Sequence, residues 1–439
     1  MTQPTPDKNS TQRLAALQHR DFFLIWIGYL ISSTGTQMQF IAVNWHIFDL
    51  LRGETYTLQL FGREFALNAS ALGLGSIGLV RVIPIVLFAL LGGLLADARD
   101  RRKLLLWVQV ASTIIAGLLA VLTLTDHITI LMIYLLTGAG AAASAMEQPA
   151  RQSIVPNLVP RHHLTNAISL NTLMNFLATV IGPMLSGVLV GAFDVGIVYA
   201  INAISFVAVI ISLLLMEYRG QAAAPEASGL GWGALVEGLR FTFGSRIIRS
   251  TMLLDFFATF FSSARTMLPI VAENVLGVGV QGYGLLSTAQ PIGALIAGTV
   301  MAWREDVKRQ GVVLLASVAI YGAATALFGV STWFILSYIL FALTGAGDTV
   351  STVIRGTLRQ VLTPDRLRGR MVSVNMVFFM GGPQLGELEA GLVAAVWGAP
   401  LAIVSGGIAT VLLTAWIAWS YPSLRNFTRE QMIAAEGLG

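Results

Sequence analysis

The stretch Gly92-Gly93-Leu94-Leu95-Ala96-Asp97-Ala98-Arg99-Asp100-Arg101-Arg102-Lys103 joins two long apolar segments of the chain. Six of the seven residues from Asp97 to Lys103 are charged, and four of them are cations. Because charged side chains are costly inside a bilayer, the chain is expected to turn in water here. Cytoplasmic loops carry an excess of lysine and arginine, so this turn is predicted to lie in the cytoplasm.

The composition of the whole chain is typical of a membrane protein. Of its 439 residues 55% are hydrophobic and only 11% are charged, whereas soluble domains average about 25% charged residues. The net charge of +4 is small, and we attribute it to arginines in loops, not to nucleic-acid binding. The chain has no cysteine, which excludes disulfides and thiolate metal sites. The polar N-terminal segment does not resemble a cleaved signal peptide.

Twelve segments are long and apolar enough to be counted as spans, since a helix needs roughly 20 residues to cross a bilayer. They cover residues 22–48, 70–95, 103–124, 128–149, 166–191, 195–216, 250–273, 282–302, 310–330, 332–354, 370–396 and 398–420. The predicted fold class is therefore an all-α membrane protein with twelve transmembrane helices. An even number of spans places both termini on one side.

The distribution of cations decides which side that is. Of 27 lysines and arginines, 23 fall in the terminal segments and in alternate loops. Only Arg52 and Arg63 fall in the opposite loops, while Arg81 and Arg265 lie inside spans. The cytoplasmic set includes Arg151, Arg355 and Arg359, assigned to loops after spans four and ten. This asymmetry predicts cytoplasmic termini.

Two segments between spans have a structure of their own. In the outer loop 49–69, residues 55–67 alternate around Gly62, which favours a short β-hairpin over a disordered loop. The middle segment contains 235–243, a predicted amphipathic helix on the membrane. The predicted divisions are 1–21, the N-terminal segment; 22–216, the first six-helix bundle; 217–249, the linker; 250–420, the second bundle; and 421–439, the tail.

The two sets of six spans repeat at an offset of 204 residues. Arg151 then falls on Arg355, and Asn171 falls on Asn375. The other matches are Leu158 with Leu362, Pro160 with Pro364, Ser169 with Ser373, Gly182 with Gly386 and Gly187 with Gly391. Internal repeats with sites at their interface are typical of secondary transporters, although a repeat can also be an inherited scaffold that does not move.

The order Gly-x-x-x-Asp with a basic cluster, two spans into such a repeat, resembles the loop between helices two and three of the major facilitator superfamily. The segments Pro149-Ala150-Arg151-Gln152-Ser153, Arg368-Gly369-Arg370-Met371-Val372-Ser373 and Ala264-Arg265 with Pro269 resemble the bacterial exporters that include macrolide-efflux pumps and the enterobactin exporter. The resemblance implies a drug:proton antiporter fold in a bacterial-type inner membrane.

Two motifs carry expectations from that resemblance. Ala178-x-x-x-Gly182-Pro183-x-x-Ser186-Gly187 in span five is similar to the antiporter motif, with Ala178 and Ser186 replacing glycines; it implies export, and ordinary helix packing is the alternative. The second motif is the loop with Gly93, Asp97 and the basic cluster. The resemblance implies that this loop latches onto the start of span eleven in the outward-facing state. The alternative is that its charges only fix the topology. The latch residues are Gly93, Asp97, Arg101, Arg102, Arg151 and Arg370.

Charges inside spans usually mark pathways or pairs. Arg81 in span two and Glu387 and Glu389 in span eleven lie at comparable depth, and the resemblance places these spans side by side. We expect Arg81 to pair with Glu387 or Glu389, either as part of coupling or as a static ion pair. Glu387, Glu389 and Asp348 are the predicted proton sites, because a desolvated carboxylate binds protons more readily.

The predicted substrate cavity takes its polar side chains from spans one, five, seven and eleven. They are Arg265, Asp255, Gln37, Asn44, Asn171 and Asn375, and hydrogen bonding between helices is the alternative role for the amides. No glycine precedes a lysine, so a phosphate-binding loop for ATP is excluded, and no metal-binding spacing occurs. An enzyme is therefore not expected, and neither is any cofactor.

The hypothesis with most support is a monomeric exporter of small amphipathic molecules, drug-like or siderophore-like, driven by protons across the lipid bilayer. An uptake carrier or uncoupled facilitator of the same fold is the alternative. A scaffold or sensor without transport is the third hypothesis.

Overall fold

A computed structural model describes residues 14–60, 63–98, 100–218, 232–304 and 307–431. The longer helices are α1 (Arg20–Leu50), α2 (Ala69–Ala98), α3 (Arg101–Leu124), α4 (Ile130–Ile154), α5 (Leu164–Ala192), α6 (Val195–Leu215), α7 (Trp232–Gly244), α8 (Arg246–Phe261), α11 (Ala289–Trp303), α12 (Gln310–Val330), α13 (Phe334–Val361), α14 (Asp365–Trp397) and α15 (Ala399–Ser420). Shorter ones are α9 (Leu268–Ile270), α10 (Gly279–Ser287) and α16 (Pro422–Arg425). The helical fold class is confirmed.

Within the described residues, nine helical segments are long and apolar enough to cross a membrane. They correspond to nine of the twelve predicted spans. The other three, 22–48, 250–273 and 370–396, form helical structure in α1, α8 to α9 and α14. The second of them is interrupted after the 16 residues of α8. The count of twelve and the side of the termini stay predictions.

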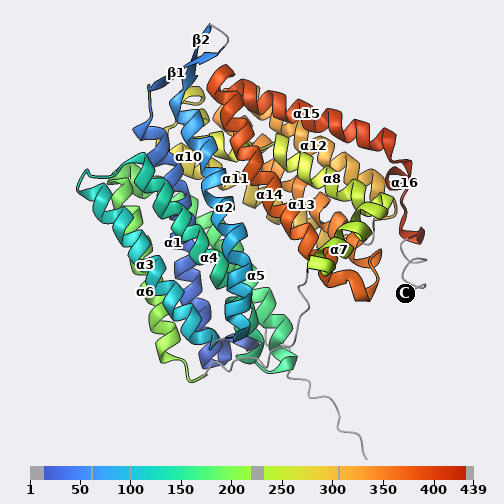
Figure 1. Ribbon diagram of the computed structural model, residues 1–439, viewed down its shortest axis with the longest axis horizontal. Helices are drawn as coiled ribbons and strands as arrows, with labels where there is room; N and C mark the ends of the chain where they lie inside the picture. The colour runs from blue at the N-terminus through green and yellow to red at the C-terminus, as the bar shows by residue number, and fades with distance from the viewer. Residues whose placement is uncertain (1–13, 61–62, 99, 219–231, 305–306, 432–439) are drawn as a thin grey trace, which may run out of the picture. The chain divides into compact units, whose positions relative to one another are not determined.

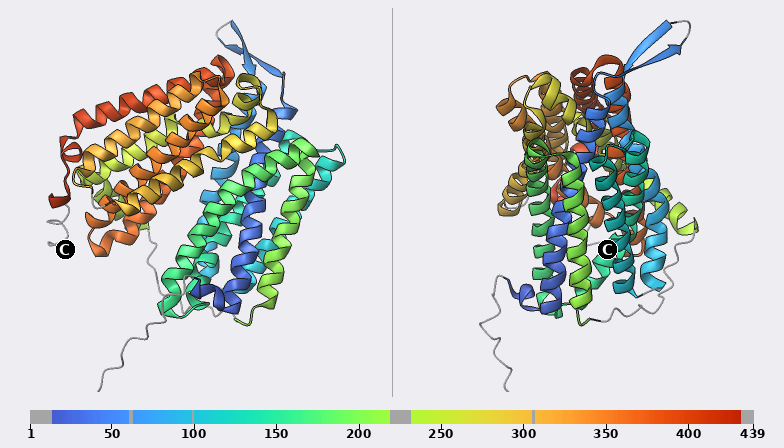
Figure 2. Two further views of the ribbon diagram at one scale, coloured as in Figure 1. Left: turned by 180° about the vertical axis from the view of Figure 1, so that it is seen from behind. Right: turned by 90° about the vertical axis from the view of Figure 1, so that its left-hand side faces the viewer.

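The chain forms two compact units. The first contains residues 1–40, 84–182 and 194–226. In it, α3 packs along α4 and along α6. α3 and α6 run side by side (Figures 1 and 2). Leu105, Ile154 and Leu213 are completely buried in this core.

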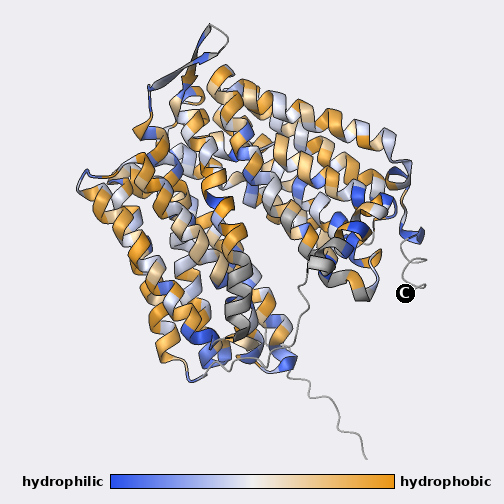
Figure 3. Ribbon diagram, in the orientation of Figure 1, coloured by the Kyte–Doolittle hydropathy of each residue, from blue (hydrophilic) through white to orange (hydrophobic). Residues whose placement is uncertain are grey.

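The second unit contains residues 41–83, 183–193 and 227–439. In it, α12 packs against α13 and α15, and α8 packs against α14. Leu254, Leu314 and Leu358 form part of the core. α12 and α15 are hydrophobic along most of their length (Figure 3), and large apolar side chains on both helices are exposed, as contact with lipid requires. Thus α1, α2 and α5 each contribute residues to both units, whereas the predicted bundles assigned each of these spans whole to the first half of the chain.

The predicted β-hairpin is confirmed, while the side of the membrane on which it lies stays a prediction. Strand β1 (Thr55–Leu60) pairs antiparallel with β2 (Arg63–Asn68), with Thr55 opposite Asn68 and Leu60 opposite Arg63. The hairpin projects from the start of α2 (Figure 1). A helix, α7, also covers the predicted amphipathic segment 235–243.

Predicted span seven is not one continuous helix. α8 ends at Phe261, a 3-10 turn covers Ala264–Met267, and a π-helical turn follows α9 at Val271–Val275. Pro269 lacks the backbone N–H that a continuous helix needs, and Ser262 directs its hydroxyl to Thr410 Oγ1 at 2.8 Å. The break matters because it places Arg265 on an irregular turn inside the unit.

The N-terminal part of α2 and the C-terminal part of α14 cross at a glycine pair. A Cβ added to Gly75 would lie 2.6 Å from the Cα of Gly391 and 3.0 Å from the carbonyl oxygen of Glu387. A Cβ added to Gly391 would clash with Gly75 Cα in the same way. Small residues at such crossings let helix backbones approach closely in membranes.

We expect Gly391→Ala to destabilise the protein by ~1–3 kcal/mol, because the new methyl group meets backbone atoms that cannot move aside. The measurement is the thermal unfolding midpoint of the purified protein in detergent. Gly381→Ala is the matched control on the same helix, since its Cβ would meet nothing within 4 Å. Equal midpoints for the two variants would contradict the close crossing.

Candidate functional site

The first charged cluster lies in the second unit and centres on Glu387 of α14. Glu387 is buried, with 8% of its surface exposed. Its carboxylate interacts electrostatically with Arg81 of α2 and Arg265 of the 3-10 turn. Glu387, Arg81 and Arg265 therefore lie within electrostatic range of one another, while the ion pair of Arg81 with Glu387 stays a prediction.

The close crossing of α2 and α14 positions this acid. Gly78, one turn beyond Gly75, lies with its Cα against α14, where an added Cβ would be 3.0 Å from Glu387 Cβ. Arg81 follows Gly78 by three residues, on the same side of α2. The broken span seven supplies Arg265 and also Thr266, whose side chain interacts with the carboxylate.

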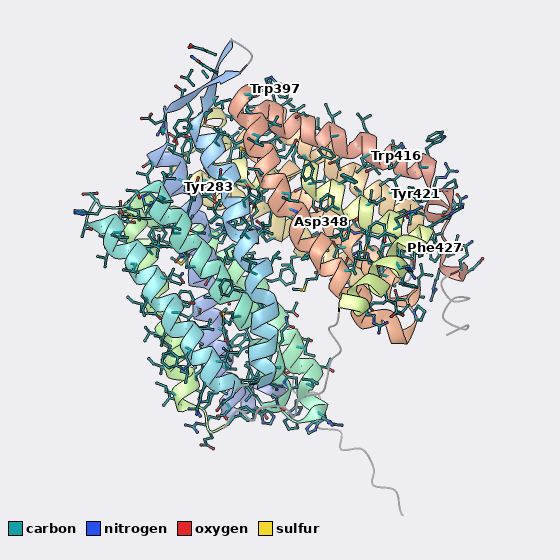
Figure 4. All side chains as sticks on the ribbon, viewed as in Figure 1. Tyr283, Asp348, Trp397, Trp416, Tyr421 and Phe427 are labelled. Carbon is teal, nitrogen blue, oxygen red and sulfur yellow. The ribbon has the colours of Figure 1, made fainter. Side chains whose placement is uncertain are left out.

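Further polar groups surround the cluster. Tyr283 of α10 interacts electrostatically with both Arg81 and Arg265 and has a polar contact with Asn44 of α1. It also stacks on Trp45 with ring centroids 6.0 Å apart. Tyr283, labelled in Figure 4, is buried, with 1% of its surface exposed. Asn44 was predicted as a cavity residue, whereas the contribution of Tyr283 was missed, because a tyrosine in an apolar segment is usually packing.

The carboxylate of Glu387 has a hydrogen-bond acceptor without a partner among the described residues. Its Oε2 atom is buried and has no hydrogen-bond partner among the described residues. An ionised carboxylate offers about four acceptor positions, and leaving one oxygen unsatisfied in an apolar setting is costly. A proton or a polar ligand group on Oε2 would remove that cost.

Glu389 is in a different environment. It lies two residues further along α14 and is half-buried, and no charged group among the described residues interacts with its carboxyl group. Residues at i and i+2 do not face the same side of a helix. Of the two predicted partners of Arg81, the structure therefore brings only Glu387 into the cluster.

A second cluster in the same unit joins α8 to α13. Asp255 is buried and binds two arginines through different oxygens, with Oδ1 2.9 Å from Arg355 Nη1 and Oδ2 3.2 Å from Arg359 Nη2. Arg355 and Arg359 are 2% and 6% exposed. Their assignment to a loop was wrong, because α13 continues to Val361 and the contacts with Asp255 allow both side chains to be buried. The cytoplasmic side of this end of α13 stays a prediction.

Two further predicted residues belong to this cluster. Asp348 lies 3.6 Å from Arg355 Nη2 and keeps 43% of its side chain exposed, on α13 within the second unit (Figure 4). Asn375 of α14 accepts a hydrogen bond from Arg359 Nη1. Asn375, predicted as a cavity residue, therefore helps to hold a buried arginine, as does the Thr251 carbonyl at 3.1 Å from Arg359 Nη2.

A third cluster lies in the first unit. The Arg151 guanidinium of α4 lies over the ring of Tyr29 from α1, with 4.0 Å between Cζ and the ring centroid. Glu147, one turn earlier, accepts a hydrogen bond of 2.9 Å from Gln109 of α3. The i, i+4 spacing of Glu147 and Arg151 could have predicted a cluster on α4, but nothing in the sequence pointed to Tyr29.

The predicted latch is only partly within the described side chains. Gly93 and Asp97 lie in α2, in a part of the helix where side chains such as that of Asp97 are outside the described residues. Arg101 donates to the Ser153 carbonyl at 3.2 Å, and Arg102 to the Leu214 carbonyl at 3.1 Å. Arg370 forms an ion pair with Glu237 of α7. The latch itself stays a prediction.

The glycines of the antiporter-like motif pack closely. A Cβ on Gly182 would lie 2.6 Å from Gln37 Cβ of α1, and one on Gly187 would lie 3.0 Å from Gly284 Cα of α10. Pro183 lies inside α5. Gln37 is thus placed at a helix crossing.

The chain matches a family model over residues 11–437, that of the transmembrane secretion effectors within the major facilitator superfamily. The chain belongs to this family. A secretion effector of this superfamily is a multi-pass membrane transporter and not an enzyme. The expected superfamily membership is confirmed, and it supports an exporter.

Curated relatives agree with this family. The enterobactin exporter EntS of Escherichia coli O157:H7 is 26% identical over 350 residues, covering 79% of this chain and 83% of the relative. EntS of Salmonella typhi is 27% identical over 349 residues, with the same coverage.

Solved structures share the fold of this secretion effector. An inward-facing bacterial homologue of the human lysosomal transporter Spinster has a TM-score of 0.69 at 14% identity, covering 92% of this chain and 96% of that one. An inward-facing bacterial homologue of the iron transporter ferroportin has a TM-score of 0.65 at 14% identity, covering 92% of this chain and 99% of that one.

In the described part of the chain, no group of three His, Asp or Glu side chains could hold a metal ion.

Proposed function

We propose that this secretion effector exports small amphipathic molecules by alternating access, in exchange for protons that bind Glu387. The single observation that carries the proposal is the buried Glu387 carboxylate, held near Arg81 and Arg265 with Oε2 unpartnered among the described residues. Ionisable groups inside a span are functional candidates by default.

The exchange follows from charge. When Glu387 is ionised, its charge offsets one of the two neighbouring guanidiniums; when it is protonated, both keep their positive charge and lose their counter-ion. The cluster therefore has two electrostatic states that differ by one proton. Two states of this kind can bias a conformational equilibrium, which here is the exchange between inward-facing and outward-facing forms of the two six-span bundles.

The cargo class follows from the relatives. The relatives are exporters of enterobactin, which supports a siderophore-like or drug-like cargo for this chain. The proposal also includes that the protein is a monomer in a bacterial-type inner membrane, with both termini on the cytoplasmic side.

The test uses inside-out vesicles that contain the protein and a pH gradient with an acidic lumen. The probe is an amphipathic fluorescent dye whose charge is constant over the pH range used. We expect accumulation that disappears when a protonophore collapses the gradient. Vesicles without the protein control for passive partitioning. Protein-dependent dye entry that is unaffected by the protonophore and stops at equal concentrations on both sides would contradict proton coupling and favour an uncoupled facilitator.

A further inference from the structure

A cavity in the first unit is not used by the mechanism above. Its volume is about 380 Å³, and it lies between the last turns of α4 and the first turns of α5. Arg151 contributes its only cationic side chain. Two carboxamides come from each helix, Gln148 and Gln152 from α4 and Asn171 and Asn175 from α5.

The four carboxamides are available for a ligand. Gln148 and Gln152 are four residues apart on one helix, as are Asn171 and Asn175 on the other, so each pair lies on one helix face. None of the four forms a hydrogen bond with another residue in the described ranges. Polar groups without protein partners in a membrane-spanning helix are found where the helix lines a water-filled space.

The internal repeat identifies what is unusual about Arg151. Its equivalent at the 204-residue offset is Arg355, whose guanidinium has carboxylates at 2.9 Å and 3.6 Å. In the described part of the first unit, no carboxylate lies within 4.0 Å of Arg151; its contacts are the Tyr29 ring and Met174 Sδ at 3.8 Å. The two halves thus share the arginine, but only Arg355 has a carboxylate within ion-pair distance in the described residues.

Glu147 does not remove this difference. It interacts electrostatically with Arg151, but it lies beyond ion-pair distance, and its Oε1 atom is bound by Gln109. Stacking on Tyr29 leaves the edge of a guanidinium, where its N–H donors are, open to other partners.

We propose that this cavity binds the anionic end of a soluble organic molecule, a carboxylate or phenolate, as a cargo-docking site in the N-terminal half. The inference rests on the proposed export function and assigns its cargo class. Arg151 supplies charge and paired donors for a planar anion, the carboxamides bind neighbouring hydroxyl or carbonyl groups, and Leu164 contacts the apolar body. The phosphate of an anionic lipid is a second source of the same chemistry.

The experiment measures equilibrium binding of fluorescein, a planar dye with a carboxylate and a phenolate, to the purified full chain in neutral detergent by fluorescence anisotropy. For Arg151→Gln we expect the Kd to rise about tenfold or more, because a charged hydrogen-bond partner is lost. The matched control is Arg161→Gln, which removes a cation from the exposed turn before α5 and should leave the Kd unchanged. Rhodamine 123, a cation on the same ring system, should not lose affinity in Arg151→Gln.

A second variant guards against misfolding of the first. Asn175 is exposed, so Asn175→Ala should fold normally and raise the Kd about threefold, the loss of one hydrogen bond. Equal Kd values for the wild type and for both cavity variants would overturn the proposal, and so would an equal loss in Arg161→Gln. A cavity that binds phosphatidylglycerol added to the micelles but does not bind fluorescein would also overturn the proposal, in favour of a lipid site. No gradient is present, so failure of proton coupling leaves this result intact.

Discussion

Asp255→Ala is expected to lower the free energy of unfolding by ~3–5 kcal/mol, the usual cost of removing one partner from a buried ion pair. Asp255 is the acid that joins Arg355 and Arg359, and all three are nearly inaccessible to solvent. Without it, two guanidiniums stay buried in α13 with only Asp348 and uncharged groups near them. The measurement is the thermal unfolding midpoint of the purified protein in detergent, together with the yield of monodisperse protein.

Two variants separate the buried network from a general sensitivity to charge. Asp348→Asn removes an acid that is 43% exposed at 3.6 Å from Arg355, and we expect it to cost less than about 1 kcal/mol. The triple variant Asp255→Leu, Arg355→Met, Arg359→Met replaces the charges by apolar groups and is expected to recover most of the lost stability. If Asp348→Asn were as damaging as Asp255→Ala, the assignment of Asp255 as the central acid would be wrong.

Glu387→Gln is expected to reduce gradient-driven dye accumulation to the level of vesicles without the protein. Glutamine keeps the shape of the side chain and can fill the hydrogen-bond positions near Thr266, but it cannot exchange a proton. The cluster then has a single electrostatic state, in which Arg81 and Arg265 are charged and residue 387 is neutral at every pH. The measurement is uptake into inside-out vesicles, with the protein level and thermal midpoint of each variant determined in parallel.

The matched control lies two residues away. Glu389→Gln removes an acid of the same helix that interacts with no charged group among the described residues. We expect accumulation to remain within about twofold of wild type, as for most substitutions away from a site. Accumulation that persists in Glu387→Gln but disappears in Glu389→Gln would move the proton site to Glu389. Persistence in both would leave Asp348 as the remaining predicted acid.

Much of the protein could be derived from its sequence by counting. Long apolar runs form helices in a bilayer because every backbone polar group must be satisfied within the segment, so helical spans such as α3, α6 and α12 follow from hydropathy alone. Alternation around Gly62 was enough for the β-hairpin, since strand pairing there is local. The superfamily followed from the motif around Asp97 and from the repeat, and the family match confirms it.

The partners of the buried charges were decided only by the tertiary structure. Spacing along one helix could not show that Glu387, and not Glu389, meets Arg81 and Arg265, because the choice depends on how α14 is rotated at the Gly75–Gly391 crossing. Positive charge near a span end also predicted loops for Arg355 and Arg359, yet Asp255, about a hundred residues earlier, allows both to be buried. Burial of a charge depends on its counter-ion, and that counter-ion comes from a distant part of the chain.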